Sequence, residues 1–119
     1  MKSYTDIEQS KKLAEFLPLE SADGFYATDD NIIIAEPYIT YLNGERNIPG
    51  YKGAVPCWSL AALLSVIRET IGYTIYGDNN VYMSCDLGDK PWKLETEVYD
   101  NEIDACYEMV LKLHEQNLL

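Results

Sequence analysis

Apolar residues recur with the spacing of an α-helix in three segments of the chain. The first begins at the capping-box pair Thr5 and Glu8 and is expected to end at Pro18, whose ring cannot continue helical hydrogen bonding. Its apolar face is predicted to contain Ile7, Ser10, Leu13, Ala14 and Leu17. One further helical turn is expected over residues 18–23, because Pro is well placed at a helix start.

The second helical segment begins near Ser59, a favourable capping residue, and continues to residue 69. Only Ser65, Arg68 and Glu69 interrupt its apolar circumference. A helix that is apolar on nearly all sides is expected to be buried. This segment is therefore predicted to be the central element of the fold.

The third helix is expected to start at Asp100 or Asn101. Its packed stripe is predicted to contain Ile103, Cys106, Tyr107, Val110, Leu113 and His114. Its solvent-facing side is predicted to contain Asp104, Glu108, Lys112 and Glu115.

Short β-branched runs predict strands over residues 31–35 and 38–41, followed by a loop over 43–53. Residues 71–76 and 81–85 predict a hairpin through the turn 77–80, with Val81, Met83 and Cys85 on one face. A last strand is expected over 92–99. Its inward face is predicted to be Trp92, Leu94, Thr96 and Val98, with Glu95 and Glu97 facing solvent.

Strands in consecutive blocks favour antiparallel pairing with helices packed against the sheet. The length of 119 residues fits one domain. We therefore predict a single α+β domain over residues 1–119, in which a mainly antiparallel sheet is packed by about three helices in two layers.

The formal net charge is −11, from 20 acidic and 9 basic residues. Such a surface repels nucleic-acid phosphates and anionic membranes, but it suits a basic protein partner. The acidic excess is strongest after Asp86. The predicted partner surface is Glu95, Glu97, Asp100, Glu102, Asp104 and Glu108. Solubility alone is the simpler explanation of this charge.

The three cysteines, Cys57, Cys85 and Cys106, lie in apolar runs and form no CxxC motif. They are expected to be reduced core residues, as is typical of a cytoplasmic protein. No apolar signal region follows Lys2, and no apolar run approaches the ~20 residues that span a bilayer. We therefore expect a cytoplasmic protein without membrane segments.

Candidate chemistry is sparse along the chain. Cys57 near a helix start and His114, the single histidine, form the one conceivable nucleophile–base set, although His114 is better explained by the dipole at a helix C-terminus. Trp58 and Trp92 are candidates for the walls of a ligand groove, although each is also typical of a core anchor. No phosphate loop, metal motif or calcium loop is present, so no cofactor is expected.

Three stretches, 4–13, 48–49 with 56–64, and 104–110 with Leu113, resemble a group of small proteins encoded by bacteriophages and mobile elements of gut bacteria. The resemblance implies a bacterial cytoplasm. Because that group has no assigned activity, it implies no site residue. The sequence favours a non-enzymatic interaction protein acting through a protein surface. The first alternative is a small-ligand-binding domain with a Tyr- and Trp-lined groove, and the second is a cysteine-dependent enzyme.

Overall fold

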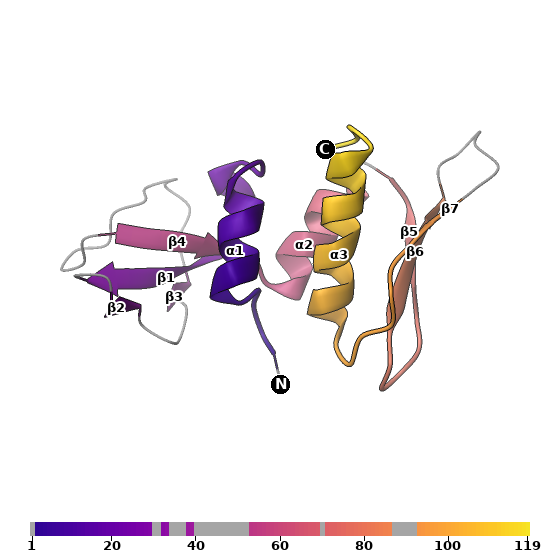
Figure 1. Cartoon of the computed structure of the whole chain (residues 1–119), viewed down its shortest axis with the longest axis horizontal. Helices are drawn as coiled ribbons and strands as arrows, with labels where there is room; N and C mark the ends of the chain where they lie inside the picture. The colour runs from indigo at the N-terminus through magenta and orange to yellow at the C-terminus, as the bar shows by residue number, and fades with distance from the viewer. Residues whose placement is uncertain (1, 30–31, 34–37, 40–52, 70, 87–92) are drawn as a thin grey trace. The chain divides into compact units, whose positions relative to one another are not determined.

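The computed structural model describes residues 2–29, 32–33, 38–39, 53–69, 71–86 and 93–119 (Figure 1). Over these residues it contains three α-helices and seven strands, and all strand pairs are antiparallel. The predicted α+β class is confirmed. The strands form two sheets, and the chain groups into two compact units: Ser3–Ala62, and Leu63–Leu119 with Met1–Lys2. The single domain over 1–119 stays a prediction.

Helix α1 (Ile7–Ala14) begins one residue later than the sequence predicts. Asp6 is its N-cap: the Asp6 carboxylate accepts from the backbone N–H of Gln9 at 2.8 Å, and the Gln9 side chain accepts from the Asp6 N–H at 3.0 Å. The predicted capping pair, Thr5 with Glu8, is therefore wrong. The reason is that the hydroxyl of Thr5 is buried in a tertiary hydrogen-bond network and is not free to cap the helix.

Two further predictions about α1 are corrected. Ala14 is exposed, whereas Ser10, Leu13 and Leu17 are buried as expected. The spacing of Glu8 and Lys12 predicts an i,i+4 ion pair, but the Lys12 ammonium instead lies 3.4 Å from the carboxylate of Glu15. The further turn predicted after Pro18 is confirmed as the short 3-10 helix η1 (Leu19–Ser21).

Strand β1 (Gly24–Asp29) is the centre of the first sheet. It pairs with β2 (Ile32–Ile33), β3 (Tyr38–Ile39) and β4 (Gly53–Cys57). Because β3 and β4 both pair with Gly24 and Phe25, they lie on opposite sides of β1. The sequence did not predict β4. The remainder of the predicted runs 31–35 and 38–41, and the loop 43–52, lie outside the described residues.

Helix α2 (Leu60–Arg68) is capped as predicted, because the hydroxyl of Ser59 accepts from the Ala62 N–H at 3.2 Å. Leu63 and Ile67 are fully buried. The prediction that α2 is buried on nearly all sides is only partly correct, because one side of the helix is exposed. Ala61 lies one turn from Ser65 and is exposed with it.

The second sheet has the order β5 (Tyr73–Tyr76), β6 (Tyr82–Asp86), β7 (Lys93–Glu95). The predicted hairpin is confirmed, with Gly77 at a φ of 97° in its turn. Val81, Met83 and Cys85 are buried as expected. Figure 1 shows α3 (Glu102–Glu115) alongside this sheet, where it packs on β6 and β7.

Helix α3 starts where the sequence predicts. Asn101 is its N-cap, accepting from the Asp104 N–H at 2.9 Å. The buried face of α3 differs from the predicted one. Contact with the sheet decides which side chains of α3 are buried, and the spacing of apolar residues alone does not. His114 is exposed and Tyr107 half-buried. The buried residues are Ile103, Ala105, Cys106, Met109, Val110 and Leu113.

The segment after β7 contains a bulge. Ser84 pairs with Glu95, whereas Val81 pairs with Tyr99, so residues 82–83 oppose the longer segment 96–98. The extra residue changes the side-chain alternation. Thr96 is buried as predicted, but Val98 is 59% exposed and not inward. Trp92, predicted on the same face, lies outside the described residues.

Candidate functional site

The second sheet has an inner face against α3 and an opposite face, which we call the outer sheet face. Because side chains alternate along a strand and paired residues point to the same side, the fully buried Met83 and Cys85 mark the inner face, and Ser84, although also buried, lies on the opposite one. The outer sheet face carries Thr74, Tyr76, Tyr82, Ser84, Asp86, Lys93 and Glu95.

An aromatic pair lies on this face. The rings of Tyr76 and Tyr82 stack with centroids 4.9 Å apart and planes inclined by 17°. Tyr76 is 42% exposed. Tyr99 pairs with the buried Val81, so alternation directs the neighbouring Val98, which is 59% exposed, away from the inner face. Two of the three large apolar side chains that are exposed among the described residues, Tyr76 and Val98, therefore share one face.

The six residues of the predicted partner surface all lie in the second unit, but they differ in exposure. Glu95, Glu97 and Asp100 are exposed, and Glu95 is on the outer sheet face. Glu102, Asp104 and Glu108 are half-buried. The structure thus divides the predicted set into an accessible half and a half that is partly withdrawn from solvent.

Glu108 has a structural role that the sequence analysis missed. Its carboxylate accepts from the Tyr99 hydroxyl at 2.6 Å, and from the backbone N–H of Glu97 at 3.0 and 3.3 Å. The same hydrogen bond, with burial, raises the pKa of Tyr99 to about 12. The predicted solvent-facing position of Glu108 is therefore corrected, because this side chain joins α3 to the segment after β7.

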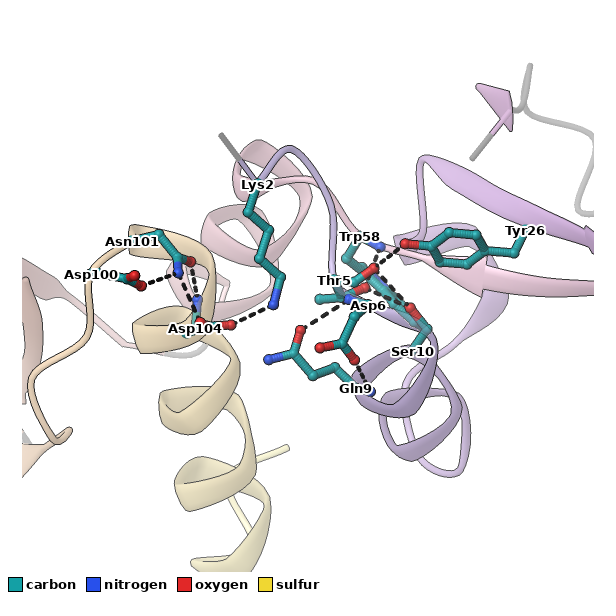
Figure 2. Close-up of polar contacts among 10 residues, drawn as sticks. All are labelled: Lys2, Thr5, Asp6, Gln9, Ser10, Tyr26, Trp58, Asp100, Asn101 and Asp104. Carbon is teal, nitrogen blue, oxygen red and sulfur yellow. Dashed lines mark hydrogen bonds and ion pairs between the residues drawn. The ribbon is translucent and has the colours of Figure 1, made fainter. Parts of the chain in front are cut away.

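The Asp104 carboxylate also has partners within the protein. The ammonium of Lys2 lies 2.6 Å from one carboxylate oxygen, and the side-chain amide of Asn101 donates to the other at 2.8 Å (Figure 2). Asn101 also donates to the exposed Asp100 at 2.8 Å. Asp104 is therefore part of the α3 start and not a freely available charge.

A buried polar network holds the first unit together (Figure 2). The Thr5 hydroxyl accepts from the Trp58 N–H at 3.1 Å and lies 2.7 Å from the Ser10 hydroxyl. The Thr5 carbonyl accepts from the Tyr26 hydroxyl at 2.7 Å. Within the described residues, no buried side-chain nitrogen or oxygen lacks a hydrogen-bond partner. This network is structural, because it leaves no polar group directed at a ligand.

Trp58, a candidate wall of a ligand groove, is instead a core anchor. Its side chain is fully buried, and its indole N–H donates to the Ser21 hydroxyl at 2.9 Å. The second candidate, Trp92, lies outside the described residues. The first unit therefore offers no Trp58 face to a small ligand.

The thiols are unsuited to nucleophilic attack. All three cysteines are free and fully buried. Burial raises the pKa of Cys57 and Cys106 to about 12 and that of Cys85 to about 11. A nucleophilic cysteine needs a lowered pKa and access to solvent. His114, the proposed base, is exposed near the end of α3, with Nδ1 3.4 Å from the Leu119 carbonyl oxygen.

In the part of the chain that the structure describes, no group of three His, Cys, Asp or Glu side chains is arranged to hold a metal ion. Of the helices in that part, none has the length and apolar character that crossing a bilayer requires. Comparisons of the chain with models of protein families, with curated proteins and with solved structures found no match.

Proposed function

We propose that this protein is a non-enzymatic interaction module that binds a basic protein partner through the outer sheet face. The observation that carries the proposal is the stack of the exposed Tyr76 on the half-buried Tyr82, with the exposed Val98 and the carboxylate of Glu95 on the same face. Tyrosine is enriched at protein interfaces because its ring packs while its hydroxyl stays hydrated.

Charge supports a basic partner. The chain carries −11 overall, the exposed Glu95 lies on the outer sheet face, and the exposed Glu97 and Asp100 follow it in the chain. Such a field accelerates encounter with a positive surface and weakens as salt rises. In this proposal the protein acts in a bacterial cytoplasm, as its resemblance to phage and mobile-element proteins implies.

The test compares three baits in pull-downs from a bacterial lysate at low and high salt. The first bait is the unchanged protein, and the second carries Glu95→Lys with Glu97→Lys. The matched control carries Glu15→Lys with Glu20→Lys, which gives the same charge change at exposed residues of the other unit. A basic protein should be recovered by the first and third baits and lost from the second.

Purified partner and bait then allow association rates to be measured. The Glu95→Lys, Glu97→Lys variant should associate about tenfold more slowly or worse at low salt, with a shallower salt dependence. Tyr76→Ala should mainly accelerate dissociation, because it removes packing and not charge. Equal recovery of every protein by all three baits would show that the acidic residues serve solubility alone.

A further inference from the structure

The two edges of the second sheet differ in how they are protected. Edge strands usually carry charges, proline or bulges that prevent another strand from pairing. β7 has such features, because Lys93 and Glu95 flank Leu94 and the bulge at 96–98 follows. β5 reads Tyr-Thr-Ile-Tyr, with no charge, proline or bulge along its four pairs with β6.

The hydrogen bonds of β6 show which backbone groups of β5 face outward. Val81 exchanges hydrogen bonds with Tyr99 (2.7 and 2.8 Å), and Met83 turns its N–H and carbonyl to Thr96 (both 2.9 Å). Because backbone groups alternate in direction along a strand, the backbone N–H and carbonyl groups of Tyr82 and Ser84 point toward β5. Their partners are Tyr76 and Thr74.

Tyr73 and Ile75, the intervening residues, consequently direct their N–H and carbonyl groups away from β6. Among the described residues β5 pairs with β6 alone, and no hydrogen bond to the backbone of Tyr73 or Ile75 comes from that outer side. The edge of β5 thus presents two donors and two acceptors at the spacing of an antiparallel or parallel ladder.

We propose that an extended, basic segment of the partner adds to the sheet as a strand beside β5. This inference rests on the proposed function and specifies how the partner is held. Main-chain hydrogen bonds to Tyr73 and Ile75 would supply affinity, and alternate side chains of the added strand would lie beside Thr74 and Tyr76 on the outer sheet face.

The charges near β5 determine the occupant. Glu69 before the strand and Asp78 after it are both exposed. The Arg68 guanidinium, which donates to the Tyr73 hydroxyl at 3.0 Å, keeps its positive charge, so two acidic residues and one basic residue leave a net charge of −1 at the ends of β5. A strand with arginine or lysine at alternate positions complements the carboxylates of Glu69 and Asp78 at the two ends of β5. A second copy of this chain is disfavoured, because each copy carries −11.

The probe is a synthetic peptide of about ten residues that alternates arginine and valine, a length that spans a typical strand. Binding is followed by amide resonances and by hydrogen exchange of the full-length protein. The peptide should slow exchange of the Tyr73 and Ile75 amides about tenfold or more, with little change at Thr74 and Tyr76, which already bond to β6. A peptide methylated at alternate backbone nitrogens should bind about tenfold more weakly.

Ile75→Pro removes the outward N–H while leaving the β5–β6 hydrogen bonds intact, and proline is tolerated at such edge positions. Ile75→Ala is the matched control for the lost side chain. The proline variant should bind the peptide about tenfold more weakly than the alanine variant. If the proline variant does not fold, the methylated peptide supplies the same comparison with the unchanged protein.

The outcomes separate the two proposals. Resonance shifts at Tyr82 and Glu95 without protection of Tyr73 and Ile75, together with equal binding of the methylated peptide, would overturn strand addition and leave binding on the outer sheet face intact. No binding at about 1 mM peptide, a concentration that detects interactions of about −4 kcal/mol, would also overturn strand addition. The pull-down with the charge variants tests the proposed function independently.

Discussion

The hydroxyl of Tyr99 donates to the carboxylate of Glu108 at 2.6 Å, and this contact joins the segment after β7 to α3. The backbone N–H of Glu97 donates to the same carboxylate. The Glu108 side chain of α3 therefore accepts hydrogen bonds from two residues, Glu97 and Tyr99, of the segment after β7. This arrangement also places the exposed Val98 between two anchored residues.

Tyr99→Phe should lower the free energy of unfolding by about 1.5–3 kcal/mol, the range for a hydrogen bond to a charged group. Urea denaturation measures the change. Tyr76→Phe, on the outer sheet face, is the control and should change stability by less than about 0.5 kcal/mol. Equal stability of the Tyr99 variant and the unchanged protein would show that the contact contributes nothing.

The pH dependence of the same contact has a definite sign. The hydrogen bond to Glu108, followed by burial and nearby carboxylates, raises the pKa of Tyr99 from 10.0 to about 12. The unfolded chain therefore loses this proton at lower pH than the folded protein does, and the contribution of Tyr99 to stability falls as pH rises from 10 to about 12. Tyr99→Phe should show a shallower loss of stability across this range. Parallel curves would contradict the assignment.

Gly77 is required by the turn of the second sheet. Its φ is 97°, and a Cβ atom built there would lie 2.0 Å from the carbonyl oxygen of Asn80. Gly77→Ala should therefore destabilise the protein by about 1–3 kcal/mol. Gly72→Ala is the matched control, because nothing lies within 4 Å of the corresponding Cβ. Thermal melts of the two variants should differ clearly, and similar melts would argue against this turn geometry.

Thr5→Val tests the buried network of the first unit. It removes the acceptor of the Trp58 N–H while preserving shape, and the Ser10 hydroxyl keeps its bond to the Thr5 carbonyl at 3.3 Å. Leaving the buried Trp58 N–H unpaired should cost about 1–3 kcal/mol. Thr74→Val, at an exposed strand position, is the control and should be nearly neutral. A Thr5 variant as stable as this control would mean that water replaces the lost hydroxyl.

The three thiols should react slowly with a thiol reagent in the native protein at neutral pH. They are fully buried, and burial raises their pKa values to about 11 or 12. The labelling rate should follow transient opening, and all three should react quickly in denaturant. Rapid native labelling of Cys57 would contradict this and would favour the cysteine-dependent enzyme.

The sequence by itself determined the elements that depend on near neighbours. The start of α2 followed from Ser59, and that of α3 was predicted at Asp100 or Asn101, of which Asn101 is the cap; a cap bonds to an N–H only three residues away. The hairpin followed from the turn at Gly77 and from the alternation of Val81, Met83 and Cys85. These signals hold because the interactions that create them lie within a few residues along the chain.

Only the tertiary structure decided the features that join distant segments. β4 exists because it pairs with β1, whose residues Gly24–Thr28 are about thirty positions earlier, and no local spacing encodes that register. Asp6 and not Thr5 caps α1, because the Thr5 hydroxyl is buried and accepts a hydrogen bond from the Trp58 N–H. Val98 faces outward because the bulge shifts the alternation of side chains in its segment. The Glu108 carboxylate accepts hydrogen bonds from Tyr99 and Glu97, although the helical pattern predicts that it faces solvent. In each case a hydrogen bond between remote residues outweighs the preference of the local pattern.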